Sequence, residues 1–420
     1  EGETTPRLRF QGFEGEWEKK LLSDCLEISD EKNTDNLYGI DDVLSVSDDS
    51  GVVNQIELLG RSYAGKSVSG YKILRPGQIV YTKSPLRQKP YGIVKVNRGK
   101  TGIVSVLYAV YNVKEGVSAE YIHYYFDPAW RLNAYMRPLV NKGAKNTMNI
   151  SDETALSDYI LIPKNIEEQE RIASFLRRID KQMTLHHQQF ERLKELKSAC
   201  LGSMFPRGTE IAPPIRFKGY EGEWETVVLK DICEMNPSCS LPESFEYVDL
   251  ESVVGTTMIS HRKEYKASAP SRAQRLAKDG DIFYQMVRPY QKNNYLFYDM
   301  GENFVFSTGY AQLRTHLDSA FVFTALQTDS FVNQVLYNCT GSSYPAINST
   351  SLANLTLKIT KNIDEQKCIS SFFRGIDSQI TTEQQRLEQL KQMKSACLRS
   401  MFPQNGGGQF AANQIQRFQR

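Results

Sequence analysis

Two segments of the sequence each occur twice, and this internal repeat constrains the fold more than any other feature. Residues 9–18, RFQGFEGEWE, return as RFKGYEGEWE at residues 216–225, and the longer segment 164–206 returns at residues 361–403. The interiors between these segments differ in length and share little sequence. Uniform drift of a duplicated domain would not confine the identity to the flanking segments. We therefore expect two diverged copies of one fold within a repeated frame.

Length and composition indicate more than one domain. A chain of 420 residues exceeds the roughly 250 to 300 residues at which single cores stop growing. The opening EGETTPRLRF lacks the order of a secretory signal, and no run approaches the roughly 18 apolar residues of a membrane helix, so we expect a cytoplasmic protein. The seven cysteines and five histidines lack metal-ligand spacing, which predicts no metal site. The net charge of +2 does not by itself indicate nucleic acid.

The longer repeated segment has the pattern of a long helix. Asn165 and Asn362 precede acidic residues as N-cap signals, and Pro206 and Pro403 follow the C-terminal ends. Apolar residues between them recur in alternating steps of four and three, which is a heptad pattern. Each helix is expected to span roughly 35 residues, or about 50 Å at 1.5 Å per residue. The predicted coiled-coil seam consists of Ile172, Leu176, Ile179, Met183, Phe190 and Leu193, and of Ile369, Phe373, Ile376, Ile380, Leu387 and Leu390.

Because each helix must bury its apolar stripe, we predict that the two copies pack together. Two equivalent lobes require an antiparallel pair about a pseudo-two-fold axis. The alternative, in which each helix lies only on its own lobe, stays open on the sequence alone. His186 and Glu383 are the only polar residues in the body of the seam, where a polar residue sets the register more often than it acts as a pH switch.

Both interiors are predicted to be mixed α/β lobes, which makes the chain as a whole an α+β protein. Short β-rich runs are expected at residues 71–74, 78–81, 102–110, 281–284 and 303–307. Helical stretches are expected after them, near residues 119–135 and 319–338. The order is the same in both lobes, and Tyr81 matches Tyr284 after a shared glycine. The lobes are therefore predicted to be copies of one fold.

Polar, basic and aromatic loops follow the matched tyrosines, and a second glycine-containing segment comes later in each lobe. Arg, Gln and Asn side chains can pair with guanine or adenine edges, whereas Lys and Ser hold phosphates. These loops are candidates for DNA contact, although solvated surface loops would have the same composition. The candidate DNA-binding residues are Lys83, Arg87, Gln88, Lys89, Lys145 and Asn146 in the first lobe, and Arg288, Tyr290, Gln291, Lys292, Asn293, Asn294, Ser342, Ser343 and Tyr344 in the second.

Two short motifs that would indicate catalysis fail in their context. Residues 60–67 match the nucleotide-binding pattern GxxxxGK[ST], but Gly70 and Pro76 follow, so no helix N-terminus is expected to receive a phosphate. Asn236 and Pro237 lack the second proline of an amino-group methyltransferase site. We therefore predict no catalytic residue in this chain.

The repeated motifs resemble those of the specificity subunits of type I restriction-modification systems, over essentially the whole chain. The resemblance rests on the paired RFxG(F/Y)EGEW openings, the paired NIxEQ helix starts and the paired KSACLxSMFP helix ends. It implies two target-recognition domains at residues 1–163 and 207–360, joined by two conserved coiled-coil helices at residues 164–206 and 361–403. Residues 404–420 would be a tail or linker.

The resemblance also implies the partners of the chain and the chemistry of the complex. Each target-recognition domain would read one half of a split double-stranded DNA site, and the helices would fix the unread spacer. Two modification subunits would methylate adenine with S-adenosylmethionine, and two restriction subunits would use ATP and Mg to translocate and cleave DNA in phage defence. This chain would hold no cofactor of its own. The alternative function is an assembly scaffold that reads no DNA sequence.

Overall fold

The computed structural model of the chain divides into two compact units. Unit 1 comprises residues 1–185 and 387–420, and unit 2 comprises residues 186–386. Each unit therefore contains one lobe and a part of each long helix. The structure describes residues 3–65, 67–142, 148–341 and 343–403. Within these ranges, no helix has both the length and the apolar character needed to cross a membrane.

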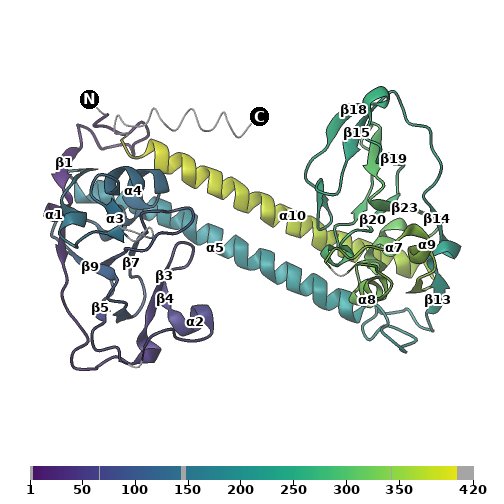
Figure 1. Cartoon of the computed structure of the whole chain (residues 1–420), viewed down its shortest axis with the longest axis horizontal. Helices are drawn as coiled ribbons and strands as arrows, with labels where there is room; N and C mark the ends of the chain where they lie inside the picture. The colour runs from purple at the N-terminus through teal and green to yellow at the C-terminus, as the bar shows by residue number, and fades with distance from the viewer. Residues whose placement is uncertain (1–2, 66, 143–147, 342, 404–420) are drawn as a thin grey trace. The chain divides into compact units, whose positions relative to one another are not determined.

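The lobe of unit 1 is built on a four-stranded antiparallel sheet of order β2-β9-β6-β7 (Figure 1). Its strands are β2 (Leu26–Ile28), β6 (Ile79–Thr82), β7 (Val94–Val96) and β9 (Tyr108–Val113). The other strands pair in twos, which are β1 (Glu18–Leu21) with β12 (Tyr159–Ile162), β3 (Leu44–Ser47) with β4 (Gly51–Asn54), β5 (Lys72–Leu74) with β8 (Gly102–Val104), and β10 (Asn141–Lys142) with β11 (Met148–Asn149). The helices are α1 (Leu22–Cys25), α2 (Gln55–Leu59), α3 (Ala119–Phe126) and α4 (Ala129–Met136).

The lobe of unit 2 repeats this sheet in the same order, as β14-β23-β20-β21. Its strands are β14 (Cys233–Met235), β20 (Ile282–Gln285), β21 (Tyr295–Leu296) and β23 (Tyr310–Thr315), and β13 (Glu225–Val228) pairs with β24 (Thr356–Ile359) as β1 does with β12. The helices are α6 (Leu229–Ile232), α7 (Ser319–Ala325), α8 (Asp329–Tyr337) and α9 (Ser349–Ala353). The predicted pair of related mixed α/β lobes is confirmed.

Unit 2 differs from unit 1 by a second four-stranded sheet of order β18-β15-β22-β19. Its strands are β15 (Ser244–Val248), β18 (Arg262–Tyr265), β19 (Ala273–Leu276) and β22 (Phe304–Ser307). The pairing of β15 with β22 is parallel, whereas the other two pairings are antiparallel. A short hairpin of β16 (Val253–Val254) and β17 (Thr257–Met258) completes the strands of this lobe.

Three predicted elements are interrupted, two of them where a side chain accepts a backbone hydrogen bond and one at a proline. The run 102–110 is two strands, β8 and β9, because the Ser105 hydroxyl accepts from the backbone N–H of Leu107 at 3.3 Å in a turn between them. The stretch 119–135 is two helices, since Pro128 precedes α4 and has no N–H to continue α3. The second-lobe stretch divides likewise at Thr328, whose hydroxyl caps α8 at Phe331.

The two long helices have the predicted ends. They are α5 (Ile166–Ser203) and α10 (Ile363–Ser400), each of 38 residues. The Asn165 side chain accepts from the backbone N–H of Glu167 at 2.8 Å, and Asn362 accepts from that of Asp364 at 3.0 Å. These contacts satisfy amide groups that the first helical turn leaves unpaired.

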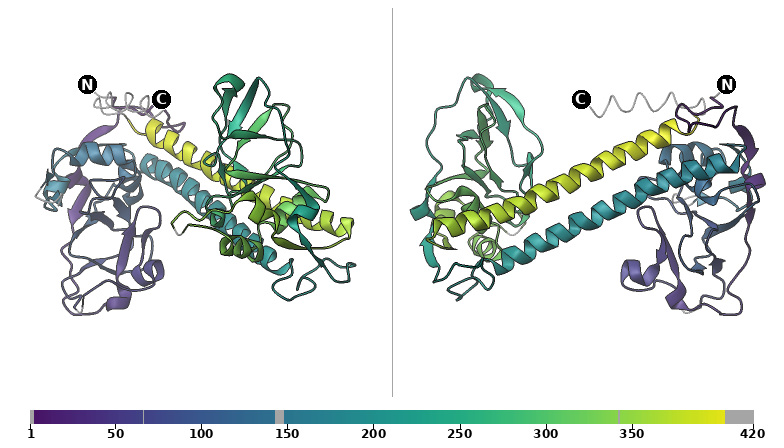
Figure 2. Two further views of the ribbon diagram at one scale, coloured as in Figure 1. Left: turned by 45° about the vertical axis from the view of Figure 1, so that its right-hand side comes forward. Right: turned by 180° about the vertical axis from the view of Figure 1, so that it is seen from behind.

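Within each unit the start of one long helix packs against the end of the other, which makes the pair antiparallel (Figures 1 and 2). In unit 1 the start of α5 and the end of α10 share one apolar core with the lobe, and in unit 2 the roles of the helices are exchanged. Each helix therefore lies on its own lobe and on the other helix at once. The seam residues Ile172, Leu176, Ile179, Leu193, Ile369, Phe373 and Ile376 are buried, whereas Met183, Phe190, Ile380, Leu387 and Leu390 are half-buried.

Polar contacts between the helices repeat with the same symmetry. In unit 1 the Lys394 ammonium lies 2.8 Å from Asp180, and in unit 2 Lys197, the matching lysine, lies 2.5 Å from Asp377. His186 Nδ1 lies 2.6 Å from a Glu383 carboxylate oxygen in unit 2. Each of these contacts links α5 to α10, so the seam pairs its polar residues with one another and thereby specifies one register.

The repeated motifs at residues 9–18 and 216–225 pack against the starts of the long helices, one in each unit. In unit 1, Arg9 donates to both oxygens of the buried Glu168 at 2.7 and 2.8 Å, and the Trp17 indole N–H donates to the same carboxylate at 3.3 Å. The Trp17 ring also meets Phe402, from the end of α10, at 6.3 Å between centroids. One opening motif, one helix start and the end of the other helix are thus joined around a single carboxylate.

Unit 2 repeats this closure with the other copies of the motifs. Arg216 donates to the two oxygens of Glu365 at 2.5 and 2.8 Å, and the Trp224 ring meets Phe205 at 5.7 Å. Glu365 is fully buried, so Arg216 is the partner that offsets the cost of holding its charge away from water. The repeated sequence is therefore explained by a repeated internal contact.

Candidate DNA interface

In unit 1 the loop between β6 and β7 contains a tight turn at residues 86–89. The backbone N–H of Leu86 donates to the carbonyl of Lys89 at 3.0 Å, and the N–H of Lys89 donates back at 3.1 Å. The Lys89 ammonium donates to Asp48 at 2.6 Å and to the backbone carbonyl of Asp127 at 2.9 Å. This lysine therefore ties the loop to the hairpin β3–β4 and to the junction of α3 and α4.

Asp127 is the centre of a charged cluster that reaches the helix pair. Lys394 of α10 lies 2.9 Å from its carboxylate and Lys95 of β7 lies 3.3 Å from it, and Lys394 also contacts Asp180. Burial by itself would raise the pKa of Asp127, but Lys394, Lys95 and Lys89 outweigh it and hold that pKa well below its usual range. The carboxylate is therefore ionised, and it fixes the loop, the sheet and the helix α10 to one point.

Lys83 is also engaged inside unit 1. Its ammonium pairs with Asp152, which accepts from Lys72 at 2.6 Å as well. Burial would raise the pKa of Asp152, but the hydrogen bonds from Lys72 and Lys83 lower it overall. Arg87 and Gln88, at the tip of the loop, are exposed. The candidates Lys145 and Asn146 lie outside the described residues.

In unit 2 the loop after β20 has a turn at the matching position, 203 residues further along the chain. Residues Pro289–Gln291 form one turn of 3-10 helix, flanked by Arg288 and Lys292, which both have a φ of 54°. The Lys292 ammonium donates to the backbone carbonyl of Gln327 at 2.9 Å and to Asp329 at 2.7 Å. Lys292 thus makes the same contact to the α7–α8 junction that Lys89 makes to the α3–α4 junction.

Two asparagines after this turn support the loop from within. Asn293 accepts from the backbone N–H of Gly255 at 2.8 Å, and Asn294 accepts from that of Gln285 at 2.8 Å. Asn294 is 1% exposed. Its amide nitrogen and the side-chain oxygen of Gln285 are buried atoms for which the described residues offer no hydrogen-bond partner. These side chains hold the loop in shape, and Asn294 is closed to a ligand in this conformation.

The two predicted loop segments of unit 2 meet at the surface. The backbone N–H of Arg288 donates to the carbonyl of Pro345 at 2.8 Å, and the Arg288 guanidinium lies over the Tyr344 ring at 4.3 Å from its centroid. Tyr344 is 64% exposed and Tyr290 is 50% exposed. Gln291 is exposed and its side-chain oxygen accepts from Gln285 at 3.2 Å. The candidate Ser343 is exposed nearby in sequence, and Ser342 lies outside the described residues.

The candidates therefore fall into two groups that the sequence alone did not separate. Members of the first group have partners inside the protein, and they are Lys83, Lys89, Lys292, Asn293 and Asn294. Members of the second group lie at the surface of the loops: Arg87, Gln88, Tyr290, Ser343 and Tyr344 are exposed, Arg288 is half-buried, and Gln291 is exposed although its side-chain oxygen accepts from Gln285. The second group is the chemically available part of the candidate interface.

Known proteins similar to this chain point to one family. Residues 221–392 match the family model of the "Type I restriction modification DNA specificity domain". The match covers less than half of the chain. The S subunit of a type I restriction-modification system from M. genitalium has a similar fold, with a TM-score of 0.63 and 13% sequence identity over 95% of this chain and 99% of that chain. The HsdS subunit from Thermoanaerobacter tengcongensis aligns with a TM-score of 0.41 and 16% identity over 92% of this chain and 96% of that chain. No curated protein sequence matches this chain.

The resemblance found in the repeated motifs is confirmed by this match, and so is the expected fold of two lobes joined by long helices. Residues 221–392 therefore resemble a type I DNA specificity domain. The matched segment contains the anchored turn of unit 2 with Arg288 and Tyr344. The first copy of the sheet and turn, in unit 1, lies outside the matched residues.

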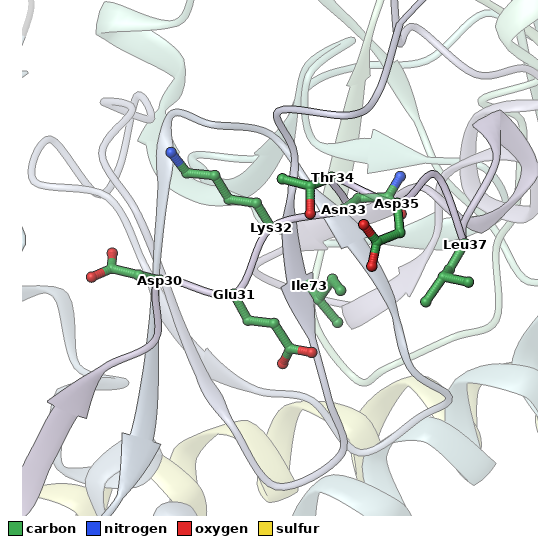
Figure 3. Close-up of a pocket in the computed structure, with 8 residues that line it drawn as sticks. All are labelled: Asp30, Glu31, Lys32, Asn33, Thr34, Asp35, Leu37 and Ile73. Carbon is green, nitrogen blue, oxygen red and sulfur yellow. The ribbon is translucent and has the colours of Figure 1, made fainter.

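A cavity elsewhere in the protein has the wrong charge for DNA. Its volume is about 490 Å³, and it lies in unit 1 beside β5. Figure 3 shows three carboxylates around it, those of Asp30, Glu31 and Asp35. Arg75 donates to Glu31 at 3.0 Å and lowers the pKa of that carboxyl group. A cluster of acidic side chains repels phosphates, so this cavity is separate from the candidate DNA interface.

The nucleotide-binding pattern at residues 60–67 has no phosphate-binding geometry in its described part. Gly60 ends helix α2 in a left-handed conformation, and a turn leads from Ser69 into β5 without a helix between them. Among the residues that the structure describes, no group of three or more His, Cys, Asp or Glu side chains could hold a metal ion.

Proposed function

We propose that the chain is the recognition subunit of a type I restriction-modification complex, with each unit reading one half of a split DNA site. In this proposal unit 1 and unit 2 are independent readers, and α5 and α10 fix the length of the unread spacer. The chain itself performs no chemistry. It directs where its partners act.

One observation carries the proposal. The same four-stranded sheet presents the same anchored turn in both units, and the anchoring lysines Lys89 and Lys292 are identical. The glutamine before each anchor is the same, Gln88 and Gln291, whereas the other surface residues of the turns differ, with Arg87 in one turn and Tyr290 and the half-buried Arg288 in the other. A constant support with different exposed side chains is what two readers of two different half-sites require, because sequence is read by side chains at base edges.

The partners follow from the symmetry of the helix pair. The repeated helix ends keep identical exposed residues in both copies, which a contact within the chain does not require. These residues are Lys194 and Lys391, Ser198 and Ser395, and Ala199 and Ala396. We infer that they receive the same partner twice, as two modification subunits that methylate adenine with S-adenosylmethionine. Two restriction subunits that use ATP and Mg would complete the restricting form of the complex.

The test is methylation mapping by single-molecule sequencing in cells that express this chain with its modification subunit. We expect a split motif with an adenine methylated in each half, and we expect the motif to vanish when the gene for this chain is deleted. In vitro, binding to the motif should weaken with salt and should fall steeply when half-site bases are changed. A methylation pattern that is independent of this chain would instead favour an assembly scaffold.

A further inference from the structure

The turn of unit 2 holds its two flanking residues in a backbone conformation that non-glycine residues seldom adopt. Arg288 and Lys292 both lie in the left-handed region, with a φ of 54°. Such positions cost energy, and they persist only where the surroundings impose them, which is most frequent at functional sites. The turn between them is therefore a point where the fold accepts strain in order to aim side chains.

Contacts on both sides impose this conformation. The backbone N–H of Arg288 is bound by the carbonyl of Pro345 at 2.8 Å, and Lys292 is bound through its ammonium by Gln327 and Asp329. Behind the turn, the buried Asn294 side chain accepts from the strand β20. The backbone at Arg288 is thus held in place before any ligand arrives.

The Arg288 side chain contacts a neighbouring ring but forms no ion pair within the described residues. Its guanidinium carbon lies over the Tyr344 ring at 4.3 Å from the centroid, a cation–π contact that does not take up a hydrogen-bond acceptor. Within the described residues no carboxylate lies at ion-pair distance from Arg288, whereas Arg216, Arg262 and Arg314 of the same unit each pair with one. The arginine is stacked, pre-oriented and lacking an acceptor.

We propose that Arg288 reads a guanine in the half-site of unit 2, and that Tyr344 is the positioning residue for it. A guanine presents O6 and N7 in the major groove as two acceptors that match two guanidinium N–H groups. This inference rests on the proposed function of the chain and adds to it the base and the residue that reads it. Lys292, by contrast, is occupied as an anchor and is not a base reader.

Unit 1 has no counterpart of this reader on its matching turn. The position that corresponds to Arg288 is Pro85, 203 residues earlier, and the exposed arginine of that turn is Arg87, where unit 2 has Tyr290. The two turns therefore aim different side chains from the same support. The guanine read by Arg288 belongs to one half-site only.

The experiment uses the full chain assembled with its own modification subunits and maps methylated motifs on a plasmid library with randomised half-sites. We expect Arg288→Ala to abolish the requirement for guanine at one position of one half-site, with discrimination falling about 10- to 100-fold. Arg288→Lys should restore it only in part, because an ammonium can reach O6 and N7 but lacks the planar fork that fixes the geometry of the guanidinium contact. Tyr344→Phe keeps the ring and should keep the motif, whereas Tyr344→Ala should weaken discrimination at the same position.

Arg87→Ala is the matched control, and it should leave the half-site of unit 2 unchanged. A uniform loss of methylation over all sequences in Arg288→Ala, with a salt dependence lower by about one unit, would mean a phosphate contact and overturn the proposal. An unchanged motif would overturn it too. If Arg288→Ala fails to fold, the discrimination at the guanine position in Arg288→Lys and in Tyr344→Ala tests the proposal in its place. The absence of any split motif with the unaltered chain would instead refute the proposed function itself.

Discussion

Both units anchor the loop of the sheet through a lysine, but the anchor of unit 1 has more charged groups around it than the anchor of unit 2. In each, a lysine of the loop donates to a backbone carbonyl where two short helices meet, Lys89 at Asp127 and Lys292 at Gln327. In unit 1 the residue at that junction is an aspartate, which gathers two further lysines and joins the loop to α10. In unit 2 it is a glutamine, and the lysine turns to the exposed Asp329 instead.

This difference shows which part of the loop is fixed and which part is free to vary. The anchor is retained although its electrostatic surroundings have changed, so the position of the turn matters more than how it is stabilised. Beside the anchor one exposed residue is retained, Gln88 and Gln291, whereas Tyr290 stands where unit 1 has Arg87 and Arg288 where it has Pro85. Two lobes of one ancestry can therefore come to read different sequences without rebuilding their support.

The largest expected effect comes from exchanging one lobe. Replacing residues 225–358 with the corresponding lobe of a related specificity protein should replace one half-site completely and leave the other unchanged, because each lobe has its own sheet and its own anchored turn. Methylation mapping of the chimera measures both halves at once. Loss of both half-sites in a folded chimera would show that the units do not read independently.

A lengthened helix pair should lengthen the unread spacer and leave the sequences of both half-sites unchanged. One heptad inserted at the midpoint of α5 and one at the matching point of α10, beside the contact of His186 with Glu383, keeps the seam in register. Seven residues add about 10 Å, or about 3 base pairs of spacer. The mapped motif gives the result directly, and an unchanged spacer would contradict the role of the helices as a ruler.

Removing the charge of Asp127 should destabilise unit 1 far more than the corresponding change in unit 2. Asp127→Asn removes the carboxylate that Lys394 and the buried Lys95 share, and because Lys394 keeps Asp180 and Lys95 keeps Asp48, the loss should cost about 2 kcal/mol of unfolding free energy. Asp329→Ala, which removes the exposed partner of Lys292, should cost less than about 1 kcal/mol. Urea unfolding followed by tryptophan fluorescence, in a Trp224→Phe background that reports on unit 1, tests the first change. Equal costs for the two substitutions would refute the contrast between the units.

The same contrast predicts a pH dependence in unit 1. The pKa of Asp127 is lower in the folded chain than in the unfolded chain, so its stabilising contribution is present above the unfolded pKa of about 3.9 and is lost as the pH falls below it. The difference in stability between the natural chain and Asp127→Asn should therefore be constant from pH 7 to 5 and shrink towards pH 2. A difference that grows on acidification would have the wrong sign for this carboxylate.

The frame of the molecule was predictable because it repeats. The N-caps at Asn165 and Asn362, the seam and the helix ends all follow from local patterns that occur twice. The opening motif was visible as a repeat, but its role was not, because the contact of Arg9 with Glu168 joins residues far apart in the chain. Long-range ion pairs leave no local periodicity to detect.

The site was only partly predictable for the same reason. Composition put Lys89 and Lys292 with the DNA-binding candidates, and nothing near them in sequence reveals the carbonyls of residues 127 and 327 that hold them. One signal was available. Both loops keep a Gln-Lys pair at the same offset while the other residues around it change, and a residue that persists inside a varying loop is typical of a structural support. The stacking of Arg288 on Tyr344 had no such signal, because the two come from different loops.

Each unit completes its core with the end of the long helix that comes from the other repeat, and this affects folding during synthesis on the ribosome. The core of unit 1 includes Phe402, which packs against Trp17 and Tyr121, yet Phe402 is translated after the whole of unit 2. Unit 2 has all of its residues, including Phe205, as soon as residue 386 has left the exit tunnel. The part of the protein that is made first is therefore the last to be completed, and the nascent chain must carry an open apolar surface in unit 1 until translation ends.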